Sequence, residues 1–275
     1  MTANELFQSI QHQKSFLCVG LDSDVKKIPN YLPRNPDGIL SFNQKIIEAT
    51  LPFAVAYKPN LAFYEALGAP GWEVLKETVD LIPNTHFKIA DAKRGDIGNT
   101  ADQYAKAFFE DLNFDAITLN PYMGMDSISP FLEYPEKWVI ILGLTSNPGS
   151  QDFQLTKTAD GKYFFEQVLE TASKWGSPEK VMFVVGATHP TYFKKVRKIV
   201  PDHFLLVPGI GAQGGDLSEV YKYGVNHKVG LLVNSSRSIL YASHEENFNI
   251  SAADQAAALR NQMSKLLNDE NPFNK

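Results

Sequence analysis

The chain has 275 residues, of which 44% are hydrophobic and 21% are charged, a composition typical of a folded globular protein. Its formal net charge is -5 and it has no long run of lysine and arginine, so we expect no general affinity for nucleic acid or for an anionic membrane. No window approaches ~18 consecutive apolar residues, and the first residues lack the pattern of a secretion signal. We therefore expect a cytoplasmic protein whose anionic ligands are small.

Cysteine and histidine do not predict a disulfide framework, a reactive thiol or a transition-metal site. The only cysteine, Cys18, lies among apolar neighbours in SFLCVGLD, which favours a packed core thiol over a nucleophile. The histidines are scattered along the chain, with no HxH or HExxH pair. We expect each of them to be structural or exposed to solvent.

Short apolar, β-branched segments recur along the chain and predict strands. They cover residues 15–22, 53–60, 86–93, 115–122, 137–145, 181–187, 204–211 and 230–236. Strands that alternate with helices need crossover connections and hence a parallel sheet, and this number of units favours closure into an α/β (β/α)8 TIM barrel. Because such barrels of about 250 residues fold as one unit, we expect residues 1–275 to form a single domain. An open, doubly wound sheet is the alternative.

One predicted helix, between the third and fourth strands, is clearly amphipathic. Asn99 or Thr100 is expected to cap its start, and its apolar face consists of Ala101, Tyr104, Ala105, Phe108 and Leu112. Residues 146–162, rich in glycine, proline, serine and aspartate, predict an irregular loop after the fifth strand, where barrels carry active-site loops. We expect a helical extension at the N-terminus and a terminal helix from Asn247 onward.

Charged residues gather where the third strand ends, in HFKIADAKRGDIGNTA, residues 86–101. Residues two apart on a strand share a face, and the carboxyl ends of barrel strands open onto one end of the barrel. Asp91 and Lys93 are therefore expected to project together into the mouth of the barrel, above Ile89, with Asp96 in the loop beyond. Three other strands also end in polar groups that could converge there: Asp22, Lys58 and Asn120.

A solvated turn would explain one charged cluster, but the recurrence of lysine and aspartate at several strand ends favours a functional site. Buried charges are tolerated when they are paired, so alternating lysines and aspartates are the form that such a cluster needs. Flanking carboxylates would keep a buried lysine protonated. The pattern predicts an ammonium group held ready as a proton donor.

The segment VPGIGAQGGD, residues 207–216, formally matches the dinucleotide-binding pattern GxGxxG. A dinucleotide fold would place this pattern near its first strand, with an acidic residue about 20 residues later. Here it follows the seventh predicted strand, and no acidic residue ends the next one. Glycine-rich backbone at this point of a barrel suits a phosphate group instead, and Arg237 is placed to add a bidentate contact. A surface ion pair is the alternative role for Arg237.

Taken together, these segments resemble the orotidine 5'-phosphate decarboxylase family. Its most specific signature, DxKxxDIxxT, is present as Asp91, Lys93, Asp96, Ile97 and Thr100. The other pieces occur in the family's order: LD at the first strand end, lysine at the second, SxPG after the fifth, PGIGAQGG after the seventh and arginine after the eighth. The combination of AYKPN, DAKRGDIGNTA and NSSRSILYA is similar to a longer bacterial branch of the family.

The resemblance implies the roles of individual residues. The charged catalytic array would consist of Lys58, Asp91, Lys93 and Asp96, with Lys93 as the proton donor. The implied substrate contacts are Asp22 at the ribose, Ser146 and its SNPG loop at the pyrimidine, Gln213 and Arg237 at the phosphate, and also Ile97, Thr100 and Pro208; Gly211, Gly214 and Gly215 would form the phosphate loop. Asp96 and Thr100 would reach into the neighbouring subunit's site, so the active unit would be a homodimer.

The implied reaction is conversion of orotidine 5'-phosphate into UMP and carbon dioxide, the last step of de novo pyrimidine nucleotide synthesis, with no cofactor and no metal. Loss of carbon dioxide leaves an electron pair on C6 that a fixed ammonium group could stabilise and then protonate. Three alternatives remain open: a Mg2+-dependent sugar-phosphate decarboxylase or aldolase, a Schiff-base aldolase that uses Lys58 or Lys93, and a barrel that binds a phosphate ligand without catalysis.

Overall fold

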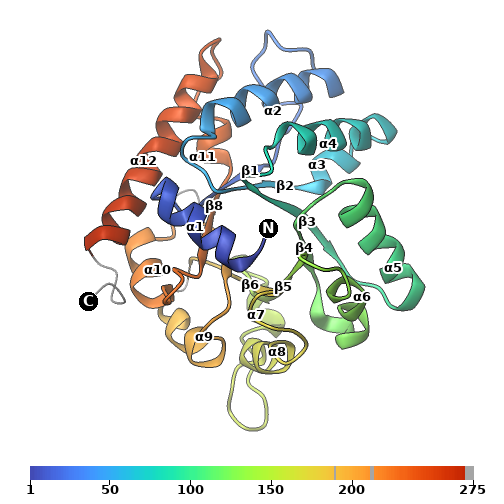
Figure 1. Ribbon diagram of the computed structural model, residues 1–275, viewed down its shortest axis with the longest axis vertical. Coiled ribbons are helices and arrows are strands. Elements are labelled where there is room, and N and C mark those ends of the chain that lie inside the picture. Colours follow the sequence, from blue (N-terminus) through green and yellow to red (C-terminus); the bar gives the residue numbers. More distant parts are fainter. Residues whose placement is uncertain (189, 211–213, 270–275) are drawn as a thin grey trace.

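The computed structural model describes residues 1–188, 190–210 and 214–269. Within these ranges the strands β1 to β8 are parallel and close into a barrel in chain order, with helices packed around the outside (Figure 1). This confirms the predicted (β/α)8 barrel and excludes the open sheet. None of the helices in the described ranges has the length and apolar character needed to cross a membrane.

The strands coincide with the segments predicted for them. They are β1 Leu17–Leu21, β2 Ala56–Pro59, β3 Phe87–Arg94, β4 Ala116–Leu119, β5 Trp138–Leu144, β6 Val181–Val185, β7 Leu205–Pro208 and β8 Leu231–Ser235. Barrel strands are buried on both faces, which explains their nearly continuous apolar sequences. Cys18, on β1, is fully buried as expected, and burial raises the pKa of its thiol to about 12.

Helices connect the strands and cover the barrel wall. They are α1 Ala3–Gln13, α2 Pro36–Thr50, α3 Leu61–Glu65, α4 Ala69–Leu81, α5 Gly98–Lys106, α6 Ser129–Leu132, α7 Ser150–Phe153, α8 Phe164–Ala172, α9 Phe193–Ile199, α10 Leu217–Gly224, α11 Arg237–Leu240 and α12 Phe248–Asp269. A π-helical turn, η1 Ala107–Asp111, continues α5, and the 3-10 turns are η2 Pro121–Met123, η3 Met125–Ser127 and η4 Pro190–Tyr192.

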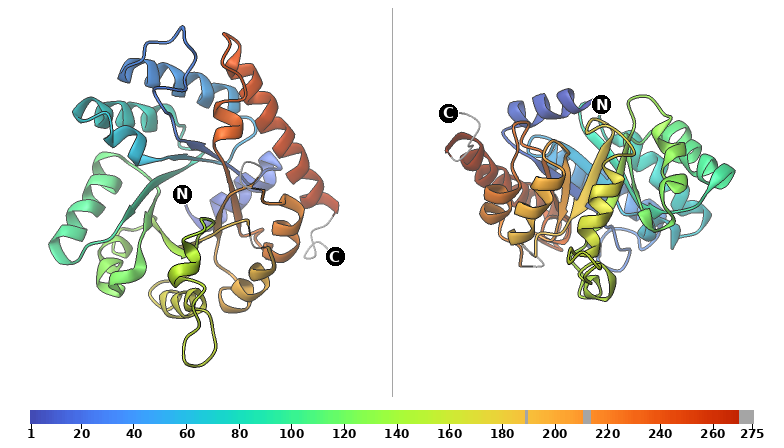
Figure 2. Two further views of the ribbon diagram at one scale, coloured as in Figure 1. Left: turned by 180° about the vertical axis from the view of Figure 1, so that it is seen from behind. Right: turned by 90° about the horizontal axis from the view of Figure 1, so that it is seen from below.

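Helix α1 lies across the amino end of the barrel, opposite the loops that follow the strands (Figure 2). Its apolar residues Leu6 and Ile10 are fully buried. The indole Nε1 of Trp138, the first residue of β5, donates a hydrogen bond to the carbonyl of Met1 at 2.8 Å. The amino end is therefore covered, and the carboxyl end remains the open one. The C-terminal helix, α12, packs against α2 and α11 on the outside of the barrel.

Two local predictions were wrong. Helix α5 begins at Gly98 with Ile97 at its N-cap and no side-chain cap, so neither Asn99 nor Thr100 caps it; Gly98, with a φ of 56°, starts the helix before them. Residues 146–162 are not wholly irregular either. They contain α7, because buried Ser150 accepts backbone hydrogen bonds from Gln154 and the following residue, and Lys157 forms a bridge with Tyr163, just beyond the segment.

Candidate active site

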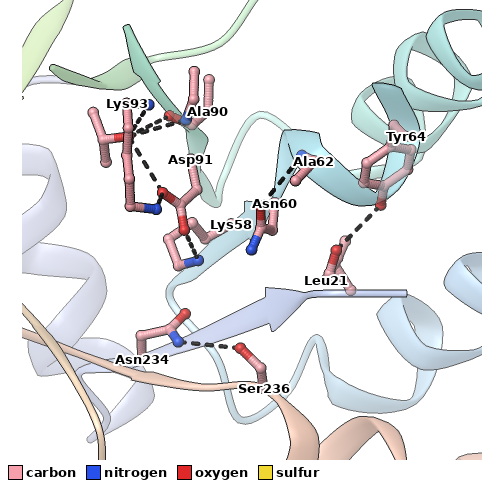
Figure 3. Close-up of polar contacts among 12 residues, drawn as sticks. Leu21, Lys58, Asn60, Ala62, Tyr64, Ala90, Asp91, Lys93, Asn234 and Ser236 are labelled. Atoms are coloured by element: carbon pink, nitrogen blue, oxygen red, sulfur yellow. Dashed lines mark hydrogen bonds and ion pairs between the residues drawn. The ribbon is translucent and has the colours of Figure 1, made fainter. Parts of the chain in front are cut away.

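Three of the predicted charged side chains meet at the carboxyl end of the barrel, where β2 and β3 end (Figure 3). The Nζ atom of Lys58 lies 2.6 Å from Oδ2 of Asp91, and Nζ of Lys93 lies 2.5 Å from Oδ1 of the same carboxylate. Asp91 therefore bridges two ammonium groups. The side chains of Lys58 and Asp91 are only 5% and 11% exposed, whereas that of Lys93 is 53% exposed and open to the barrel mouth.

The charges stabilise one another. Burial alone would lower the pKa of Lys58, but the carboxylates of Asp91 and Asp22 outweigh burial and raise that pKa. Burial likewise opposes ionisation of Asp91, yet the charges of Lys58 and Lys93 hold its pKa well below the usual range. Lys58 and Asp91 are thus both ionised at neutral pH, and the carboxylate of Asp91 lies between the ammonium groups of Lys58 and Lys93.

An irregularity in β3 shapes this cluster. The pairing of β3 with β4 shifts register between Ala90 and Arg94, and Lys93 has a φ of 48°, which is uncommon for a residue other than glycine. Thr118 of β4 stabilises the bulge, because its Oγ1 accepts the backbone N–H groups of Ala92 and Lys93, both at 2.9 Å. Thr118 is a polar residue inside an otherwise apolar strand, and this is the sequence signal by which its role could be recognised.

Asp22 and Asn234 supply buried acceptors that no described residue satisfies. Asp22 follows β1, and Asn234 lies on β8, which pairs with β1. Oδ1 of each residue is buried without a hydrogen-bond partner in the described part of the chain. Since an unpaired buried acceptor costs free energy, these oxygens are suited to hydroxyl or N–H groups of a ligand.

A glycine makes room for the acceptor on β8. A Cβ atom at Gly20 would lie 1.9 Å from Oγ of Ser236 and 2.9 Å from Oδ1 of Asn234. The two side chains are joined by a hydrogen bond of 3.2 Å from Nδ2 of Asn234 to Oγ of Ser236 (Figure 3). Gly20 therefore allows β8 to present polar side chains toward the end of β1.

The predicted phosphate site is only partly described. Arg237 is the first residue of α11, is exposed, and forms none of the ion pairs found in the described ranges. Pro208 ends β7, and Gly214 has a φ of 83°. A Cβ atom at Gly215 would lie 2.6 Å from Cβ of Ala187. Gly211 and Gln213 lie outside the described residues.

The second half of the signature does not join the charged cluster within one chain. The carboxylate of Asp96 accepts the backbone N–H of Ile97 at 2.8 Å and forms no ion pair with Lys58 or Lys93. Ile97 is 50% exposed, and Thr100 is exposed in the first turn of α5. These residues lie on the surface beside the barrel mouth rather than inside it.

Two other predicted site residues, Ser146 and Asn120, differ in their burial and their contacts. Ser146 is half-buried after β5 and lies against Gly186 at the end of β6, where a Cβ atom would approach Cβ of Ser146 to 2.8 Å. Asn120 does not converge with the charges as expected. It is exposed, and its Oδ1 accepts the backbone N–H of Tyr122, so it caps η2 instead.

A cavity of about 680 Å3 lies apart from the charged cluster. Asn120, Tyr122, Phe153 and Phe165 are among the residues that line it, and Lys58, Asp91 and Lys93 are not. In the described ranges, no group of three or more histidine, cysteine, aspartate or glutamate side chains is arranged to hold a metal ion. The ion-paired cluster of Lys58, Asp91 and Lys93 is therefore the candidate active site at the mouth of the barrel.

The closed barrel and the charges at its open end define a (β/α)8 protein of the class that carries its active site at the carboxyl ends of the strands. Residues 15–248 match the model of the orotidine 5'-phosphate decarboxylase / HUMPS family. The chain therefore belongs to that family, as its signature residues suggested.

Similar proteins extend over nearly the whole chain. Orotidine 5'-phosphate decarboxylase of Phocaeicola vulgatus is 55% identical over 97% of this chain and 99% of its own length. Among solved structures, OMP decarboxylase of Leishmania donovani is 38% identical with a TM-score of 0.82, covering 96% of this chain and 99% of that one. UMP synthase of the same organism is 40% identical with a TM-score of 0.81, covering 92% of this chain but 56% of that one.

Proposed function

We propose that the protein converts orotidine 5'-phosphate into UMP and carbon dioxide, the last step of de novo pyrimidine nucleotide synthesis. The observation that carries the proposal is the pairing of Asp91 with two lysines, one buried and one open to the mouth of the barrel. Proteins similar over nearly the whole chain are named for this activity, which supports the same reaction.

The chemistry requires a carbanion to be stabilised and then protonated. When the bond between C6 and the carboxylate breaks, the electron pair stays on C6 and carbon dioxide leaves. The ammonium group of Lys93 stabilises that pair electrostatically and transfers a proton to C6, and the resulting amine regains a proton from water. Asp91 keeps the ammonium in place, and Lys58 keeps Asp91 ionised.

The phosphate group lies far from C6 and supplies binding energy rather than chemistry. Arg237 is exposed and not engaged in an ion pair in the described ranges, so its guanidinium is available to a phosphate. Gly214, Gly215 and Pro208 lie on the neighbouring strand end and loop. Binding energy from this distant contact can favour the closed state over the reacting ring and so raise turnover.

The active unit is proposed to be a homodimer in which Asp96 and Thr100 complete the partner's site. The exposure of Thr100, and the lack of an ion pair between half-buried Asp96 and Lys58 or Lys93 of its own chain, support this arrangement. Apolar side chains on the adjoining turns also favour a subunit interface: Ile97, Tyr122, Met123 and Met125 are 50%, 85%, 49% and 49% exposed. We further propose that the chain acts as one barrel domain. Its cytoplasmic location stays a prediction.

The test is the absorbance of orotidine 5'-phosphate mixed with the purified, EDTA-treated protein. We expect rapid loss of the orotate chromophore and formation of UMP. An unchanged spectrum, with UMP binding confirmed separately, would support a phosphate-binding barrel without catalysis. Turnover of a sugar phosphate only after addition of Mg2+ would support the metal-dependent alternative. Trapping of a carbonyl substrate by borohydride would support the Schiff-base alternative.

A further inference from the structure

The hydroxyl group of Tyr241 joins two loops at the mouth of the barrel. It donates a hydrogen bond to the backbone carbonyl of Asp22 at 2.8 Å and accepts one from the backbone N–H of Asp24 at 2.8 Å. Both partners belong to the loop after β1, whereas Tyr241 directly follows α11. One phenol group therefore ties the loop after β1 to the segment after β8.

The opposite side of the same loop is held by Ser23, which is 2% exposed. Its Oγ donates to Oδ1 of Asn43 at 2.5 Å, and Nδ2 of Asn43 donates to the hydroxyl of Tyr64 at 3.1 Å and to that of Thr78 at 3.0 Å. Asn43, Tyr64 and Thr78 lie on α2, α3 and α4. Three helices thus fix Ser23 through a connected, buried polar network, which makes the loop rigid.

Asp22 is contacted by Tyr241 and is followed directly by the buried Ser23, so its backbone is fixed, whereas its carboxylate can still accept a hydrogen bond. Its carbonyl is bound by Tyr241, whereas its buried Oδ1 has no partner among the described residues. Ligand-binding side chains need this combination, because the supporting contacts set their position and leave the acceptor free.

Tyr241 is also connected to Arg237. Its backbone N–H donates to the carbonyl of Arg237 at 3.1 Å, and this bond closes α11. The ring stacks on Phe42 of α2, with the centroids 6.2 Å apart and the planes at 15°, which limits its rotation. The backbone of Tyr241 is therefore hydrogen-bonded to the helix that carries Arg237, and its side chain is hydrogen-bonded to the backbone of Asp22.

We propose that Tyr241 is a positioning residue that sets the distance between the ribose-binding Asp22 and the phosphate-binding Arg237. The inference rests on the proposed function and adds a residue that touches neither the substrate nor the charged cluster. Its hydroxyl acts through the backbone of Asp22 and Asp24, and Ser23 supports the loop from the other side. When these two residues are held at a fixed spacing, one substrate molecule can contact both without first ordering the loop, which strengthens its binding.

The test is Tyr241→Phe, which keeps the ring and removes only the hydroxyl. Because two hydrogen bonds to the loop are lost, we expect KM for orotidine 5'-phosphate to rise about tenfold, with kcat changed by less than about threefold. In an Asp22→Ala background the same substitution should change kcat/KM by less than about twofold, since Tyr241 acts through Asp22. Ser23→Ala should raise KM in the same direction by a smaller factor.

The matched control is Tyr57→Phe. The hydroxyl of Tyr57 lies 2.8 Å from Oγ1 of Thr50 and donates to the carbonyl of Ile47 at 3.2 Å, so its loss should lower Tm without raising KM. A merely structural role for Tyr241 would lower Tm and change kcat/KM equally in both backgrounds, and either that result or an unchanged KM would overturn the inference. An inactive wild-type protein would instead refute the proposed function. A fully active Asp22→Ala variant would refute both the binding role of Asp22 and the positioning role of Tyr241.

Discussion

The two halves of the DxKxxDIxxT signature have opposite environments. Asp91 and Lys93 are fixed at the end of β3 by ion pairs and by Thr118, and Asp91 is nearly buried. Asp96 and Thr100, only a few residues later, lie at the surface and do not contact that cluster. One chain therefore builds the part of the site that depends on strand ends, whereas the loop residues are the ones that we propose to complete the site of a second chain.

The difference has a physical cause. Parallel strand ends must converge in a closed barrel, so residues on β2 and β3 are brought together whatever their type. A loop carries no such constraint, because its backbone is not held by a ladder on both sides. Its position relative to a site is then set by the surface on which it docks.

The largest effect is expected for Lys93→Ala. Loss of the proton donor should lower kcat by at least several powers of ten, while Tm stays near the wild-type value because the Lys93 side chain is 53% exposed. The control is Lys76→Ala, which removes a similarly exposed lysine, 49%, from its ion pair with Asp111. Near-normal turnover of orotidine 5'-phosphate by Lys93→Ala would remove Lys93 from the mechanism.

Arg237→Ala should have the next largest effect. Loss of the phosphate contact is expected to lower kcat/KM for orotidine 5'-phosphate by about a thousandfold. Activity on the nucleoside orotidine, which lacks the phosphate, should change little. The informative quantity is the ratio of kcat/KM for nucleotide and nucleoside; an equal ratio in the wild type and the variant would contradict the phosphate role.

Asp91→Asn should destabilise the protein and change its pH response. Breaking the buried pair leaves Lys58 without its partner and should lower the free energy of unfolding by about 3 kcal/mol at pH 7. The lowered pKa of Asp91 means that its stabilisation is present above about pH 4 and is lost as the pH falls below it. The raised pKa of Lys58 means that its stabilisation is present below about pH 10 and is lost above it.

Urea unfolding of the wild type and of Asp91→Asn at several pH values measures the contribution of this ion pair to the free energy of unfolding. The difference between the two proteins should be constant near neutral pH and should shrink progressively below about pH 4. A difference that is the same at pH 3 and at pH 7 would mean that the carboxylate of Asp91 is not stabilised by its lysines.

The smallest effects should separate two adjacent residues of α5. Asn99 and Thr100 are both exposed, and neither caps the helix, so alanine at either position should change the free energy of unfolding by less than about 0.5 kcal/mol. Only Thr100→Ala should reduce kcat/KM, by about tenfold, because only Thr100 is proposed to reach the partner's site. Equal kinetics for the two variants would argue against that contact.

The barrel and the pairing of charges at the strand ends were predictable from the sequence. Apolar runs of strand length at regular intervals predict the parallel barrel, and the two-residue spacing of Asp91 and Lys93 predicts a shared face. The position of Lys58 beside them follows from the adjacency of consecutive strands.

Features that depend on side-chain direction at irregular backbone were not predictable. The bulge in β3 and its support by Thr118 involve a register shift that hydrophobic periodicity does not encode. Arg94, next to Lys93 in the sequence, turns away and pairs with Glu65 of α3. Asn120 caps its own turn rather than joining the cluster, because an asparagine at a strand end can satisfy either role.

The most direct test of a site shared between two chains is a subunit-mixing experiment. Lys93→Ala and Asp96→Ala proteins should each be inactive alone. Mixed under conditions that allow subunits to exchange, they should form hybrids with one intact site, and equal amounts should recover about a quarter of the wild-type activity. No recovery, when differently tagged chains are shown to copurify, would contradict the account and assign Asp96 to the site of its own chain.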